Sequence, residues 1–137
     1  MRSALAAAAL AATLVCAGCG GVSAPDLFLV QRSGQGPHAR LTLRVNEEGG
    51  VHCNSGPTLK LSDAQLVEAR GIQEELHNAA SAKLSLPPQP GSVLSFYVRD
   101  VDGSARFSDN STGQPKVLRQ LALFVLRVAQ QVCHLPE

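Results

Sequence analysis

The four cysteines of this 137-residue chain fall into two pairs, and this division constrains the fold more than any other feature. Cys16 and Cys19 end an apolar N-terminal run, whereas Cys53 and Cys133 lie in the rest of the chain. Once the first pair is assigned to a processed leader, two thiols remain, and in an oxidising compartment they most simply pair. We therefore predict a Cys53–Cys133 disulfide, which closes a loop of roughly 80 residues and stabilises the fold by about 4 kcal/mol.

The N-terminal 18 residues have the layout of an export signal. Arg2 supplies the positive charge, and the apolar run of residues 4–15 is too short to span a bilayer as a permanent helix. The following Ala17-Gly18-Cys19 resembles the lipobox of bacterial lipoproteins, with Cys16 standing where that pattern prefers leucine. The resemblance implies a diacylglycerol on Cys19, whereas cleavage by an ordinary signal peptidase would give a freely secreted protein.

This processing divides the chain into three parts. Residues 1–18 are the predicted signal peptide, residues 19–25 are the lipidated cysteine with a short flexible tether, and residues 26–137 form a single disulfide-bonded domain. Two acyl chains suffice for stable anchoring, so we expect an extracytoplasmic domain held at the cell membrane through Cys19.

Hydrophobic periodicity predicts both strands and helices. Five segments have the apolar composition or the two-residue alternation of strands: residues 26–32, 41–46, 51–53, 93–100 and 105–109. Residues 63–80 and the segment that begins at Pro115 have helical spacing. The order ββ(β)αββα predicts an α+β fold, a two-layer sandwich with a mostly antiparallel sheet of four to five strands and both helices on one face.

Local signals mark the element boundaries. Ser62 and Gln65 form a capping-box pattern before the first helix, and the proline-rich residues 86–91 predict a stiff connector. Asp102-Gly103 predicts the turn of a hairpin, because both residue types tolerate positive φ. Asn110-Ser111-Thr112 is expected to cap the second helix.

Charge and composition exclude several classes of function. Without Arg2, the 12 basic residues become 11 and balance the 11 acidic residues, and the chain has no Trp. A neutral chain without basic runs gives no electrostatic sign of nucleic-acid binding or of a polybasic lipid-binding patch. No Walker or dinucleotide glycine pattern appears either, so we expect neither nucleotide nor any other cofactor.

The sequence also argues against catalysis and metal binding. No Gly-x-Ser-x-Gly elbow is present, and the four histidines have no evident nucleophile beside them, so we expect a non-enzymatic domain. A zinc site from His52-Cys53 and Cys133-His134 is disfavoured because neighbouring strand residues point to opposite faces. The acidic residues around Asp102-Gly103 lack the other ligands of a calcium loop. We predict no metal site.

Several short segments together resemble the emfourin family, small proteinaceous inhibitors of thermolysin-like metallopeptidases. They are Arg32-Ser33-Gly34, Leu86-Pro87, Tyr97 with Asp102-Gly103, and Asp109 to Pro115 leading into Leu118 and Leu121. The resemblance implies a sheet with two helices that blocks a metallopeptidase cleft without a cofactor. The leader, the predicted disulfide and a loop without Gly-Gly depart from that pattern. The chain also resembles a class of small actinobacterial lipoproteins.

Our leading hypothesis is a membrane-anchored lipoprotein whose domain binds another protein, for which an extracytoplasmic peptidase is the suggested partner. The predicted contact surface combines Arg32, Ser33 and Gly34, at the start of the loop to Arg40, with the hairpin tip Asp102-Gly103. Two other classes remain open: a carrier of a small apolar ligand between sheet and helices, and a hydrolase that uses His52 or His134. The sequence does not specify an oligomeric state.

Overall fold

Alternating strand segments and two amphipathic segments give six strands and two helices in the structure, a computed structural model that describes residues 25–136. The strands are β1 (Asp26–Gly34), β2 (Leu41–Asn46), β3 (Gly50–Cys53), β4 (Thr58–Lys60), β5 (Leu94–Arg99) and β6 (Ser104–Ser108). The helices are α1 (Asp63–Ser81) and α2 (Lys116–Gln131).

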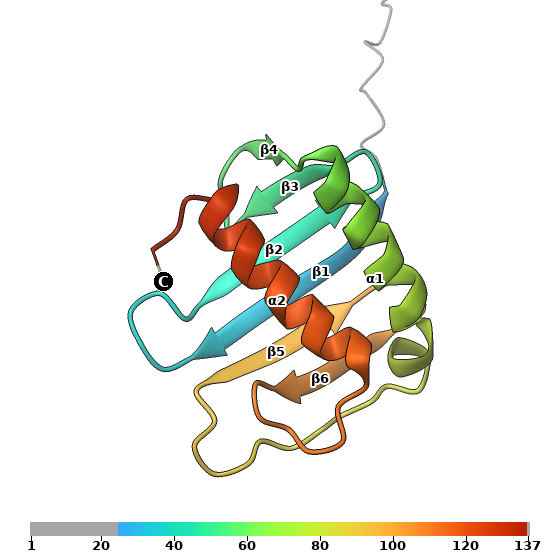
Figure 1. Cartoon of the computed structure of the whole chain (residues 1–137), viewed down its shortest axis with the longest axis vertical. Helices are drawn as coiled ribbons and strands as arrows, with labels where there is room; N and C mark the ends of the chain where they lie inside the picture. Colours follow the sequence, from blue (N-terminus) through green and yellow to red (C-terminus); the bar gives the residue numbers. More distant parts are fainter. Residues whose placement is uncertain (1–24, 137) are drawn as a thin grey trace, which may run out of the picture.

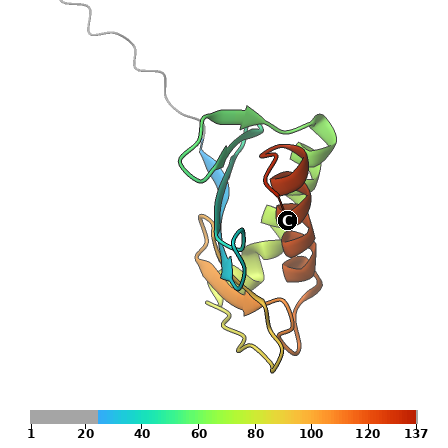
Figure 2. The ribbon, with the colours of Figure 1, turned by 90° about the vertical axis from the view of Figure 1, so that its left-hand side faces the viewer.

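The strands form one antiparallel sheet in the order β4-β3-β2-β1-β5-β6. Both helices lie on the same face of this sheet, and α2 crosses it diagonally (Figure 1). The view from the side shows the two layers, with the opposite face of the sheet bare of helices (Figure 2). The predicted two-layer α+β fold is therefore confirmed.

The sheet has six strands rather than the four to five that we predicted. The additional strand, β4, pairs with β3 through Val51 opposite Leu59 and His52 opposite Thr58. Three residues after Gly56-Pro57 are too few to show an alternation, and only Leu59 packs against the core. The strand exists because β3 presents an edge to which the returning chain can pair.

The core fills the space between the sheet and the helices. Phe28 of β1 and Phe124 of α2 are both fully buried, and their rings meet edge to face with centroids 6.0 Å apart. On the neighbouring strands Leu43 and Val98 point the same way and are also fully buried. Alternate residues of the strands therefore build the core, while their neighbours face the bare side of the sheet, except that the consecutive residues 27–30 of β1 are all buried.

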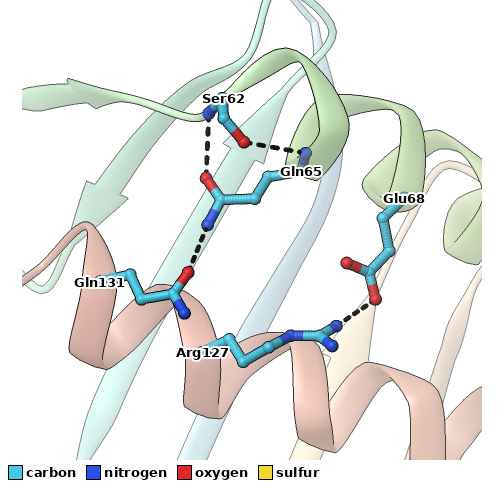
Figure 3. A network of polar contacts seen from close by, with 5 residues as sticks. All are labelled: Ser62, Gln65, Glu68, Arg127 and Gln131. Atoms are coloured by element: carbon cyan, nitrogen blue, oxygen red, sulfur yellow. Dashed lines mark hydrogen bonds and ion pairs between the residues drawn. The ribbon is translucent and has the colours of Figure 1, made fainter.

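The first helix begins as its capping signal predicts. Gln65 donates its backbone N–H to the Ser62 hydroxyl, and its side-chain carbonyl accepts the Ser62 N–H. The Gln65 amide also donates to the side chain of Gln131 on α2, at 3.2 Å, and Arg127 pairs with Glu68 nearby (Figure 3). These contacts join the two helices along their outer side.

The start of the second helix differs from the prediction. Pro115 is the residue before the first turn, and no side chain caps the helix. The Ser111 hydroxyl instead accepts the Ser108 N–H and donates to the Leu86 carbonyl, and Asn110 exchanges hydrogen bonds with the backbone of Gln89. The predicted cap was wrong because the turn after β6 brings these residues beside the connector, whose backbone groups they satisfy.

The connector from α1 to β5 covers the outer edge of β6. The N–H of Arg106 donates to the Leu84 carbonyl at 2.8 Å, and the N–H of Leu86 donates to the Arg106 carbonyl at 2.9 Å. Ser85 and Arg106 thereby form a parallel bridge. The connector thus pairs with this edge at Arg106, and its residues 85–88 border the bare face of the sheet.

Candidate functional site

The bare face of the sheet, hereafter the open face, carries a row of polar side chains across four neighbouring strands. Gln31 of β1 lies opposite Thr42 of β2 on one side and Tyr97 of β5 on the other, and Tyr97 lies opposite Arg106 of β6. The strand residues that flank this row, such as Val30 and Val98, are fully buried under the helices. The row is therefore positioned by the same alternation that builds the core.

A groove of about 620 Å³ follows this row. Besides the four residues of the row, it is lined by Ser33, Arg40, Ser95 and the connector residues 85–88, with Arg32, Phe96, Phe107 and Ser108 completing its lining. Its floor thus offers hydroxyl and amide groups, and arginines stand at its two sides, Arg40 just before β2 and Arg106 on β6.

Arg106 lies in this groove with its guanidinium stacked on an aromatic ring. Its central carbon is 4.5 Å from the centroid of the Tyr97 ring. A guanidinium that stacks through its face keeps its N–H groups in the plane of the group, where they can meet a planar acceptor such as a carboxylate. The stacking therefore orients Arg106 before any ligand arrives.

Basic residues outnumber acidic ones within the strands, although the chain as a whole is nearly neutral. Asp26 is the only acidic residue within the six described strands, and it pairs with Arg44 at 3.5 Å. The open face also carries Arg99, Arg106 and Lys60, whereas the two helices together are balanced, with four acidic residues and one basic residue in α1 and three basic residues and no acidic one in α2. The open face is therefore basic, which overall composition concealed.

Arg32, predicted as a contact residue, is buried with 3% of its surface exposed. Its Nε donates to the Ala39 carbonyl and its Nη2 to the His38 carbonyl, both at 3.0 Å. Its side chain thus braces the loop between β1 and β2, while residues 35–38 are exposed. This burial argues against direct contact of Arg32 with a partner, because the charged end of the side chain turns inward to bind loop carbonyls.

Ser33 and Gly34 end β1 and are exposed, as a contact surface requires. Gly34 has φ of 156°, and a Cβ at this position would lie 2.1 Å from the Val93 carbonyl oxygen. The N–H of Gln35 donates to the same carbonyl at 3.1 Å. A glycine is required here because the backbones of β1 and the residue before β5 approach closely.

The predicted contact surface is divided between opposite ends of the sheet. Because β1 and β5 are antiparallel, Gly34 pairs with Leu94 at the start of β5, whereas Arg99, just before the hairpin tip, pairs with Leu29. The β1–β2 loop and the β5–β6 tip accordingly emerge at opposite ends in Figure 1. A partner that contacts both would have to extend along the length of β1 and β5, because the antiparallel register separates them.

The hairpin tip is packed against α1. The Asp100 carboxylate accepts the N–H groups of Asp102 and Gly103, at 2.8 and 3.1 Å. A Cβ on Gly103 would lie 2.4 Å from the Ala80 carbonyl oxygen, so only glycine allows this approach. His77 Nδ1 lies 3.0 Å from the Asp102 carboxylate. The tip therefore holds the end of α1 in place.

The environment of His77 favours its protonated form. The hydrogen bond to Asp102, and then the negative charge of that carboxylate, raise the pKa of His77 above its ordinary value. The pair borders a second, open pocket of about 670 Å³, which Glu47, Arg70 and Glu74 also line. In this structure the pair joins α1 to the hairpin.

Asp109 fastens the end of β6 to the start of β5. Its carboxylate accepts hydrogen bonds from the hydroxyls of Ser92 and Ser108 and from the N–H of Val93. Burial acts to raise the pKa of Asp109, but these hydrogen bonds together lower it. The residue therefore supports the border of the groove as a carboxylate.

The remaining predicted site residues are cysteines and histidines. Cys53 and Cys133 form a disulfide, with Cα atoms 6.0 Å apart, which joins β3 to the segment after α2. His52 lies on the open face, with Nε2 2.9 Å from the Thr58 hydroxyl. Within residues 25–136, no group of three or more His, Cys, Asp or Glu side chains is placed to hold a metal ion. Cys19 lies outside the described residues.

Sequence reasoning missed Arg106, and although it named the loop to Arg40 and the hairpin strand of Tyr97, it did not place these residues on one groove. The signal was the type of residue at the solvent-facing positions of the predicted strands, where these polar and aromatic side chains stand. A hairpin closed by residues 100–103 places Tyr97 opposite Arg106. No local pattern shows that β1 and β5 are neighbours, because β2, β3, β4, α1 and the connector separate them in the chain.

Comparisons with protein-family models and with curated proteins found no significant match. Neither of the two helices in the described part of the chain is both long and apolar enough to cross a membrane.

Proposed function

We propose that this chain is a membrane-anchored lipoprotein whose domain binds an extracytoplasmic protein without catalysing a reaction, and that the partner is a metallopeptidase inhibited in the emfourin manner. Cys19 provides the lipid anchor. The β1–β2 loop, residues 35–40, provides the contact. The observation that carries the proposal is the buried Arg32, which braces an exposed loop from inside the domain.

A braced loop suits binding because less conformational entropy is lost on association. Each flexible side chain that must be ordered costs about 0.5–1.5 kcal/mol, and a loop already held in one conformation avoids much of this cost. The hydrogen bonds from Arg32 reach His38 and Ala39, at the far side of the loop. Gln35, Gly36 and Pro37 remain exposed at its tip. The loop can therefore enter a cleft without collapsing.

The other two classes receive less support from the same structure. A carrier needs space between the sheet and the helices, but large side chains such as Phe28, Leu121 and Phe124 fill that layer and are fully buried. A hydrolase would need a site that excludes water. The contact of His52 on β3 with Thr58 on the edge strand β4 is exposed, so it does not provide one. A protein-binding domain, by contrast, can use the exposed β1–β2 loop and the polar open face of the sheet.

Inhibition assays with the full chain, purified from membranes in detergent, test this proposal. We expect micromolar chain to slow a panel of thermolysin-like peptidases. Pro37→Gly, which loosens the loop, should weaken inhibition about tenfold. Val101→Ser at the exposed hairpin tip, on the opposite end of the sheet, is the matched control and should change nothing. No slowing at micromolar concentration would refute peptidase inhibition.

The lipid anchor is tested separately by intact-mass measurement of the membrane fraction. The expected result is removal of residues 1–18 with added acyl mass on Cys19. A Cys19→Ser variant should leave the membrane fraction. A soluble wild-type chain without acyl mass would show that the protein is secreted.

A further inference from the structure

We propose that the groove on the open face binds an extended acidic peptide segment of the partner, with carboxylates held by Arg106 on one side and Arg40 on the other. This inference rests on the proposed function only in that the domain binds a protein. It does not require the partner to be a peptidase, and it places contact on the open face, which shares only Arg40, the last residue of the loop, with the contact proposed above.

The spacing of the two arginines sets the length of the ligand. Arg40 directly precedes β2 and Arg106 lies on β6, so β1 and β5 separate them. Three strand spacings of about 4.8 Å place the two backbones roughly 15 Å apart. In an extended peptide, side chains four positions apart point the same way and are separated by about 13 Å. Two carboxylates with that spacing can reach both arginines while the peptide crosses the strands.

The floor between the arginines suits a peptide backbone. Gln31, Ser33 and Ser95 supply neutral donors and acceptors along the groove, and Thr42 adds another hydroxyl. A polyphosphate chain, with a charge on every unit, would place several charges over this neutral floor. A peptide needs charges only at the two ends, and its backbone amides can hydrogen-bond in between. The pattern of charged ends and a neutral floor therefore favours acidic peptide.

Arg106 is the stronger of the two contacts. Its guanidinium is stacked on Tyr97, 4.5 Å from the ring centroid, and the backbone of Arg106 is held on both sides, by β5 and by the connector. Its fork of N–H groups is thus oriented in advance for a carboxylate, which lowers the ordering cost of binding. Tyr97 acts here as a positioning residue.

The groove contains its own reporter, because Tyr97 is the only tyrosine of the chain and the chain has no Trp. Tyrosine emission of the full chain therefore monitors this site directly. The probe is a short peptide of glycine and serine with two glutamates separated by three residues. We expect a saturable change in emission with Kd on the order of 100 µM. A peptide with glutamine in place of glutamate should produce no change.

Two variants that each remove one positive charge from the open face distinguish binding in the groove from a general attraction to that face. Arg106→Gln should weaken binding at least about tenfold, since it removes a charge-assisted bidentate contact. Arg99→Gln lies on the same face but outside the groove, so it should change binding less than about twofold. Because Arg106→Gln also alters the tyrosine environment, isothermal titration calorimetry measures its affinity independently.

Saturable binding that is lost in Arg106→Gln and kept in Arg99→Gln supports the groove. Equal losses in both variants, or no emission change up to about 1 mM peptide, would overturn it. Tighter binding of a peptide with adjacent glutamates, or displacement by micromolar tripolyphosphate, would overturn the assignment to a spaced acidic peptide. Peptide binding together with failed peptidase inhibition would leave this inference standing and refute the inhibitor function alone.

Discussion

Removal of the disulfide offers the largest single test of how the fold is held together. The bridge joins β3 to the segment after α2 over a sequence separation of 80 residues. In the chain-entropy relation, closing a loop of that length lowers the entropy of the unfolded chain by about 15 cal/mol/K, which is about 4.5 kcal/mol at 25 °C. Domains of this size have unfolding free energies of about 5–15 kcal/mol, so the bridge supplies a large share.

The double variant Cys53→Ala, Cys133→Ala should therefore unfold at a urea midpoint lower by about 2 M, given slopes of about 1–3 kcal/mol/M. Circular dichroism of the full chain follows the transition. Wild-type protein under strong reductant is the control and should approach the variant, because both lack the cross-link. A loss of less than about 1 kcal/mol would refute the reasoning, since it would mean that the bridge does not restrict the unfolded chain.

Three further predictions concern single residues. Arg32→Met leaves two loop carbonyls without a donor and should destabilise the fold by about 2–4 kcal/mol in urea, with faster amide exchange in residues 35–40. Gly103→Ala should cost more than about 2 kcal/mol, because its Cβ would meet a backbone carbonyl at 2.4 Å, whereas Gly91→Ala, which meets nothing within 4 Å, should cost only about 1 kcal/mol. His77 gains stability from its raised pKa below its ordinary value of about 6.5, so the unfolding free energy should fall as pH rises through the folded pKa, and His77→Gln should abolish that slope.

Most of the fold could be predicted because its signals are local. The capping box at Ser62 and Gln65 begins α1 at the expected residue, and the alternation of residues 41–46 matches β2 in both bounds. β4 could not be predicted, because its three residues are held by pairing to β3 rather than by any preference of their own. The cap expected at Ser111 failed for a similar reason, since its hydroxyl meets a connector that lies 25 residues away in sequence.

The candidate site was much less predictable, because it depends on which strands are neighbours. Arg32 occupies a position where an exposed arginine is ordinary, and only the folded loop shows that its guanidinium turns inward. The loop after Gly34 and the tip at Gly103 were combined into one surface, although an antiparallel register places them at opposite ends of β1 and β5. Sequence patterns describe the face of a strand well, but they do not specify its neighbours.

The two faces of the strands explain how such a small domain can combine stability with recognition. In β5, Phe96 and Val98 pack under the helices, whereas Tyr97 between them faces the groove. Changes on the open face therefore alter charge and hydrogen bonding without opening a cavity in the core. The connector and the Asp109 hydrogen bonds fix the border of that face, and Arg32 fixes the loop at its end. The residues that would contact a partner therefore occupy strand positions that face away from the core, while the core on the other face of the sheet fixes their backbone.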